Sequence, residues 1–175
     1  RDLHLSLRRQ RQMCIRDRIM MHHSKSLITF TILIFLFSFK SAFSQNAEDI
    51  VKYRINIMKA IGGHISVIAA NVKGKVDIQE DIKTHSQALY ITIKSINIEK
   101  TFPPKTSHKE IENSRALEDI WVATEEYNIA MQNSILAAKN LSDIANSGDK
   151  NAVGKALGAL GKTCGACHKK FRKEK

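Results

Sequence analysis

Three residues near the end of the chain have the types and the spacing needed to attach a cofactor covalently. The segment Cys164-Gly165-Ala166-Cys167-His168 reads C-x-x-C-H, the attachment signal of c-type haem. On a helix, two thiols three residues apart share one face, so both can form thioethers to the vinyl groups on one haem edge. The imidazole that follows then points at the iron. The motif predicts one covalent haem c, with Cys164 and Cys167 as thioether links and His168 as the proximal iron ligand.

Two other chemistries use a C-x-x-C pair. A redox disulfide of the thioredoxin type opens a helix within a βαβ context, and no strand pattern is visible in this chain. A zinc site needs four ligands, so it would have to recruit His64, His85 or His108 from elsewhere. A chance occurrence of the motif is the third alternative. The export signal described below, and the absence of any other cysteine from residues 45–175, favour haem.

The net charge of the 175-residue chain is +11, but it is unevenly distributed. Six arginines and two aspartates in residues 1–19, with two lysines in residues 20–44, account for six of these charges. Residues 45–175 therefore carry only +5, and the whole-chain basicity does not predict nucleic-acid binding. We interpret residues 1–19 as a non-native leader resembling translated vector sequence, with Met20 or Met21 as the native start. A basic nucleic-acid-binding arm is the alternative.

Residues 20–44 have the pattern of a secretory signal peptide. Lys25 supplies the positive charge, and residues 27–39 form an apolar run shorter than the roughly 20 residues that span a bilayer. Small residues precede Gln45, so we expect cleavage between Ser44 and Gln45 and a periplasmic protein. An uncleaved anchor is the alternative. We expect no stable membrane insertion of the mature domain, residues 45–175.

The mature domain is expected to be all-α, an antiparallel up-down-up-down four-helix bundle. Apolar residues recur in steps of three and four over residues 47–73 and 77–100, then over about 114–145 and 149–172. Gly74 is expected to end the first helix, Pro103-Pro104 the second, and Asp149 to cap the fourth. Residues 105–113 are expected to form a polar loop.

The order of these features resembles the cytochrome c′ family, the class II c-type cytochromes. The resemblance covers nearly all of residues 45–175, and only the haem motif is specific by itself. The other features that carry it are the pair Tyr53-Arg54, His64, Gly74, Phe102, Trp121 and the terminal CHKKFRK. In this register the sixth iron position falls to Met58, four residues after Arg54. A methionine there implies the low-spin branch similar to cytochrome c-556, with Met58 as the distal iron ligand.

Each of these residues has a plainer alternative role. Met58 could fill the distal pocket without binding iron, as methionine fills gaps in many cores. Arg54 is expected to bind a haem propionate, the alternative being a solvated helix arginine. Arg172 is expected to cover the proximal face of the haem, the alternative being a positive charge that the dipole favours at the C-terminal end of the helix. His64 lies about 240° around the helix from Met58 and is expected to be a surface or packing histidine. The residues expected to pack in the core or against the haem are Phe102, Trp121, Tyr127 and Met131.

Two functions follow, neither of them enzymatic, because no general base, nucleophile or substrate pocket is recognisable. The first is an electron carrier with His168/Met58 ligation, docking acidic redox proteins through the lysines around position 170. The alternative is a five-coordinate haem protein that binds nitric oxide or carbon monoxide on the distal face. The resemblance also implies a homodimer formed through the first two helices. We expect no nucleic-acid partner.

Overall fold

The computed structural model describes residues 46–174 of the chain. The leader expected at residues 1–19 and the signal peptide expected at 20–44, with its cleavage site, lie outside the described residues. The described part begins with a long N-terminal helix, Asn46–Val72. The remaining helices are α2 (Gln79–Lys94), α3 (Ile98–Thr101), α4 (Asp119–Val122), α5 (Thr124–Ala145) and α6 (Lys150–Phe171).

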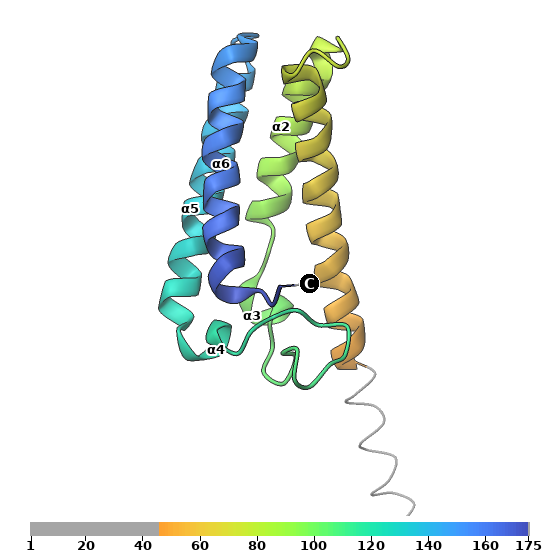
Figure 1. Ribbon diagram of the computed structural model, residues 1–175, viewed down its shortest axis with the longest axis vertical. Helices are drawn as coiled ribbons and strands as arrows, with labels where there is room; N and C mark the ends of the chain where they lie inside the picture. The colour runs from red at the N-terminus through yellow and green to blue at the C-terminus, as the bar shows by residue number, and fades with distance from the viewer. Residues whose placement is uncertain (1–45, 175) are drawn as a thin grey trace, which may run out of the picture. The chain divides into compact units, whose positions relative to one another are not determined.

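The four long helices run alternately up and down, so that each is antiparallel to the next along the chain (Figure 1). Over residues 46–174 the only β-type pairing is the isolated antiparallel bridge between Ala116 and Arg172. The expected all-α, up-down-up-down four-helix bundle is therefore confirmed. The two short helices α3 and α4 belong to the long connection between α2 and α5, at the end of the bundle where α6 finishes.

The expected ends of three helices are correct. Gly74 follows the N-terminal helix with φ of 67°, and Gly148 follows α5 with φ of 73°. Both values lie in the left-handed region that side chains disfavour, which makes glycine the natural residue there. Asp149 then caps α6, its Oδ1 accepting hydrogen bonds from the backbone N–H groups of Asn151 and Ala152 at 2.8 and 3.1 Å.

Two expected helices are wrong in extent. The helix expected over 77–100 ends at Lys94, because Asn97 leaves the helix and its Oδ1 accepts the backbone N–H of Lys100, which starts α3. The helix expected from Ser114 begins only at Asp119 and is interrupted at Ala123 (φ −107°, ψ 52°). The residues before Asp119 instead make hydrogen bonds to other parts of the bundle. The irregular segment therefore extends beyond the polar loop expected over 105–113 and ends only where α4 begins.

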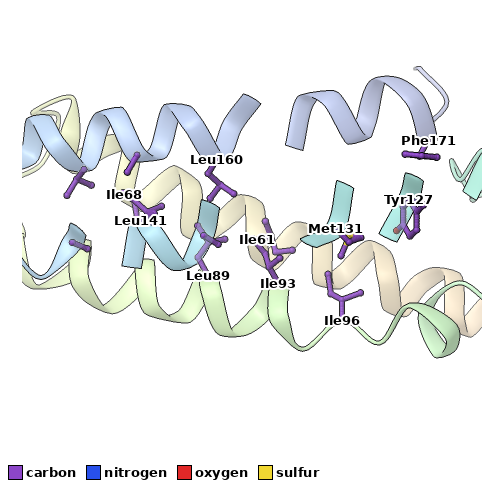
Figure 2. Packing of buried hydrophobic residues seen from close by; sticks show 14 of the residues in the cluster. Ile61, Ile68, Leu89, Ile93, Ile96, Tyr127, Met131, Leu141, Leu160 and Phe171 are labelled. Atoms are coloured by element: carbon purple, nitrogen blue, oxygen red, sulfur yellow. The ribbon is translucent and has the colours of Figure 1, made fainter. Parts of the chain in front are cut away.

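The core runs along the bundle axis and is built from all four long helices (Figure 2). Ile61 and Ile68 come from the N-terminal helix, and α2, α5 and α6 add further large side chains. Those labelled in the figure are Leu89, Ile93, Ile96, Tyr127, Met131, Leu141, Leu160 and Phe171. The buried Asn71 fixes the first turn, because its Oδ1 accepts the backbone N–H of Ile78 at 2.8 Å.

The N-terminal helix is apolar along much of its length. Judged by length and composition alone, it is the one helix among residues 46–174 that could cross a membrane. The same helix contributes Ile61 and Ile68 to the bundle core and also contains the buried Arg54. These contacts explain its apolar stripe as one face of a bundle helix.

Two leucines on α5 allow a matched test of this packing. Leu141 is fully buried, whereas Leu136 is 63% exposed. Leu141→Ala should lower the free energy of unfolding by about 2–5 kcal/mol, because it removes buried methyl groups and leaves a cavity. Leu136→Ala should change it by less than about 0.5 kcal/mol. Urea unfolding followed by circular dichroism measures both, and equal effects of the two substitutions would contradict the arrangement of α5.

Candidate haem site

The two cysteines and the histidine of the motif lie on the last turns of α6, on the side of the helix that faces the bundle. Cys164 and Cys167 are half-buried free thiols packed against the core cluster. Burial raises the pKa of both thiols, so both are protonated at neutral pH before modification. They lie three positions apart, so they present two sulfur atoms about one helical turn apart, as the motif predicts.

His168 is neutral and partly accessible. Burial lowers the pKa of its imidazole, and the nearby positive charges of Arg172 and Arg115 lower it further. The neutral imidazole is the form that binds a metal ion. An open hollow of about 370 Å³ lies beside it, lined by Arg115, Gly165, His168, Lys169, Arg172 and Glu174. His168 and Arg172 therefore share one hollow.

The end of α6 is held in place by the segment that precedes α4. The backbone N–H of Leu117 donates to the carbonyl oxygen of Phe171 at 3.0 Å, and that of Lys173 donates to Arg115 at 2.8 Å. The Nε of Arg115 in turn donates a hydrogen bond to the carbonyl oxygen of Lys173 at 2.9 Å. These bonds fix the last turn of α6 and the motif with it.

Met58 occupies a position on the inward face of the N-terminal helix. Buried residues precede and follow it in steps of three and four, so the helical period places Met58 on the same stripe. Arg54, one turn earlier, is 5% exposed, and Ile61, one turn later, is 8% exposed. Met58 is nevertheless 36% exposed. The inward stripe of this helix therefore has an opening at Met58.

The register of the two helices puts that opening level with the haem motif. A Cβ added at Gly154 of α6 would lie 3.0 Å from Cγ1 of Val72, so the helices are in close contact there. The N-terminal helix and α6 run in opposite directions (Figure 1). Counting fourteen residues from that contact along each helix, nearly four turns, leads to Met58 on one and His168 on the other. Met58 and His168 are therefore at a similar height in the bundle.

These residues fit a c-type haem. On α6 the buried Leu160 and Phe171 flank the half-exposed thiols and imidazole, as Arg54 and Ile61 flank Met58. Both helices thus interrupt their buried stripes at the same level, where a flat apolar group can be enclosed. Two thiols would supply the thioether links of such a group, and an imidazole and a methionine thioether are axial iron ligands that it uses.

The zinc alternative finds no support. Within residues 46–174 no three His, Cys, Asp or Glu side chains come together as a metal site would require. His108 lies in the loop before α4, where its Nδ1 is within hydrogen-bonding distance, 3.2 Å, of the carbonyl oxygen of Ala116. His64 pairs with His85 at a higher level of the bundle, with 2.9 Å between their Nδ1 atoms. Sequence reasoning treated these two histidines separately and missed the pair.

Arg54 is a buried cation that anchors the long connection between α2 and α5, and the alternative of a solvated arginine is wrong. Its Nη1 donates to Thr106 Oγ1 at 2.9 Å, and its Nη2 donates to the Thr106 carbonyl and to Ser114 Oγ. The guanidinium carbon lies 5.0 Å from the centre of the Phe102 ring. Burial lowers its pKa from 12.5 to about 10, so it keeps its charge at neutral pH. No carboxylate among residues 46–174 forms an ion pair with it.

The aromatic residues singled out in the sequence pack together below Arg54. The Tyr127 ring makes edge contacts with Phe102 and Phe171, at centroid distances of 5.3 and 5.1 Å. Trp121 Nε1 donates to the Phe102 carbonyl at 2.9 Å. Met131 is buried in the core, as expected. The cluster closes the end of the bundle next to the haem motif.

Comparisons with known proteins agree with this geometry. The family model described as Cytochrome C′ matches residues 49–172. A cytochrome c′ of Pararhodospirillum photometricum is 34% identical over 71% of this chain and 97% of that protein. A cytochrome c-556 of Agrobacterium tumefaciens is 30% identical over 70% of this chain and 93% of its own length. A solved nitric oxide complex of a cytochrome c prime variant from Alcaligenes xylosoxidans superposes with a TM-score of 0.65, at 27% identity, over 74% and 97% of the two chains.

The fold and the site define a helical-bundle haem protein of the c type. More particularly, the chain belongs to the cytochrome c′ family, and its cofactor is a covalently bound haem c. The likeness to cytochrome c-556, the branch favoured by Met58, is the minor one among these relatives.

Removing the Arg54 guanidinium tests its anchoring role. Arg54→Met should lower the free energy of unfolding of the haem-loaded protein by about 2–4 kcal/mol, because three hydrogen bonds from a charged donor are lost. Lys52→Met, at a site with 59% of the side chain exposed, is the matched control and should be within about 0.5 kcal/mol of the parent. Chemical unfolding measures both, and an Arg54→Met protein as stable as the control would refute the anchor.

Proposed function

We propose that this protein binds nitric oxide or carbon monoxide at the iron of its haem c. The observation that carries the proposal is the likeness, over 97% of the solved chain, to a cytochrome c′ variant in complex with nitric oxide. The haem iron supplies an open coordination position to which a diatomic molecule binds. The residues of this chain attach the haem, hold the iron from one side and shape the space on the other.

Cys164 and Cys167 are proposed to carry the thioether links and His168 to hold the iron on the proximal side. The half-buried thiols one turn apart support the first assignment. The neutral imidazole, kept so by burial and by Arg172 and Arg115, supports the second. The backbone bonds between residues 115–117 and 171–173 hold this helix end, so the imidazole keeps its position when the distal side changes.

Met58 is proposed to form the distal wall. Two observations support this assignment: Met58 lies at the height of His168, and it is exposed between the buried residues of the inward stripe. An unbranched methionine adapts its shape at little cost, so it can fill the space in the absence of gas and give way when gas enters. In this role its thioether excludes water from the distal side and limits the size of molecule admitted.

The second candidate is the electron carrier in which the Met58 thioether binds the iron. The similar heights of Met58 and His168 favour it, because one residue from each helix would then complete the axial pair. Exposed Lys169 and Lys173 beside the motif could dock an acidic redox protein. In either function Arg54 could also neutralise a haem propionate, since its buried charge has only neutral partners among the described residues.

The setting of the protein is part of the proposal. Residues 20–44 have the pattern of a signal peptide cleaved near Ser44–Gln45, which would deliver the chain to the periplasm. A homodimer through the N-terminal helix and α2 is consistent with the exposed Tyr53 and Ile91 on those helices. Redox proteins and a second copy of the chain are therefore the partners we expect.

Optical spectra with matched methionine variants separate the two functions. If Met58 is only a wall, the ferrous protein shifts its spectrum with carbon monoxide, and Met58→Ala speeds binding about tenfold or more by opening the distal side. Met131→Ala, a change at a buried methionine of the core, should leave the binding rate unchanged. Low-spin spectra, no response to carbon monoxide, and a sulfur-to-iron band lost in Met58→Ala would establish the electron carrier instead.

Covalent attachment is tested at the motif. Cys164→Ser with Cys167→Ser should leave no haem on the chain after acid–acetone extraction, whereas either single change should retain one link and shift the pyridine haemochrome band. Lys169→Ala, an exposed change on the same turn, should keep both links. Haem that remains bound to the double variant after extraction would contradict the assignment.

A further inference from the structure

We propose that His64 and His85 form a binding site for a divalent transition-metal ion, Cu²⁺ by preference, separate from the haem. His64 lies on the N-terminal helix and His85 on α2, twenty-one residues apart in sequence. Their Nδ1 atoms are 2.9 Å apart, and their rings have centroids 5.1 Å apart with an angle of 59° between the planes. The two nitrogens thus face each other across the helix interface.

The pair has the geometry of a hydrogen bond and must rearrange to hold an ion. The centroid separation of 5.1 Å is close to the 2.9 Å between the nitrogens plus the distance from each nitrogen to its ring centre, so the Nδ1 atoms point at each other. Both rings must therefore turn about their Cβ–Cγ bonds before their lone pairs point at one ion, which then lies beside the line between the nitrogens. Copper binds imidazole more tightly than other first-row divalent ions, and this order favours Cu²⁺.

The protonation of the pair suits a metal ion. Burial lowers the pKa of His64, and the neighbouring His85 lowers it further, so His64 is neutral at pH 7. Without metal, one Nδ1–H can donate to the other Nδ1. When a metal binds, the donating ring shifts its proton from Nδ1 to Nε2, and both Nδ1 lone pairs become ligands. Forming the site therefore costs the hydrogen bond between the two rings and the turn of each ring.

The helices hold the two histidines in place. His64 lies between the buried Ile61 and Ile68, and His85 between the buried Ile82 and Leu89, so both backbones are fixed by the core. Both side chains are half-exposed, and an ion can reach them from solvent. In the described part of the chain no third His, Cys, Asp or Glu joins the pair, so water fills the remaining positions.

The site is distinct from the haem. His64 lies six residues beyond Met58 on the same helix, which is about 9 Å along its axis. A metal ion at the pair would link the N-terminal helix to α2 without contacting the haem ligands. The ion would therefore stabilise the folded bundle by an amount that grows with the logarithm of its free concentration.

Calorimetric titration of the haem-loaded ferric protein with Cu²⁺ tests the proposal, the ferric form being used so that Cu²⁺ is not reduced. One ion per chain should bind, with an unchanged haem spectrum and a raised unfolding temperature. His64→Gln and His85→Gln should each weaken binding about 100-fold or more, because the second ligand of a chelate is lost while an amide keeps a hydrogen-bonding side chain. His108→Ala, which removes a histidine outside the pair, should bind as the parent does.

The two glutamine variants also show whether a failure concerns folding. Each should retain the helical circular dichroism and the haem spectrum of the parent. A parent that binds Cu²⁺ no more tightly than the glutamine variants would overturn the proposal and leave a hydrogen-bonded histidine pair only. Loss of binding in His108→Ala alone would overturn it as well. Binding by residues before position 46 is common to all variants and cancels in the comparison.

Discussion

The haem site depends on the close contact between the N-terminal helix and α6. Gly154 has no side chain, and Val72 occupies the space where a Cβ would come within 3.0 Å of it. This contact sets both the separation and the register of two antiparallel helices. Because helices stay nearly straight over fourteen residues, the register set at Gly154 also determines the heights of Met58 and His168. A contact almost four turns away therefore sets the heights of these two residues.

The second constraint is the buried charge of Arg54. The guanidinium is 5% exposed and has no carboxylate partner among residues 46–174, so interactions with neutral groups must replace its hydrogen bonds to water. It donates to the carbonyl and hydroxyl of Thr106 and to the hydroxyl of Ser114, and it lies over the face of Phe102. Of these residues, Ser114 lies outside a helix although the sequence pattern favours a helix from that position. The long irregular connection between α2 and α5 is thus explained by one side chain on another helix.

The sequence was informative wherever the signal is local. The spacing of Cys164, Cys167 and His168, the cap at Asp149 and the positive φ at Gly74 all depend on residues within one turn of each other. The helical period likewise predicted the bundle, whereas Met58 was singled out by the family resemblance.

The errors occur where the deciding partner is distant. The period of apolar residues continues through Ser95–Asn97, so the end of α2 was not visible in it. The alternative of a solvated Arg54 was wrong, because its partners lie 52 and 60 residues away in the chain. His64 and His85 follow no motif, and only the register of two helices brings them together.

The segment from Thr106 to Leu117 joins the two helices that face each other across the haem position. At one end it holds Arg54 of the N-terminal helix, and at the other it pairs with the backbone at the end of α6. It therefore links the helix of Met58 to the helix of His168. In the proposed gas-binding function, an outward movement of the helix of Met58 would be opposed, through this segment, by the hydrogen bonds at the end of α6. The hydrogen bonds of the segment, as well as the residue at position 58, would then set how easily the space beside Met58 opens.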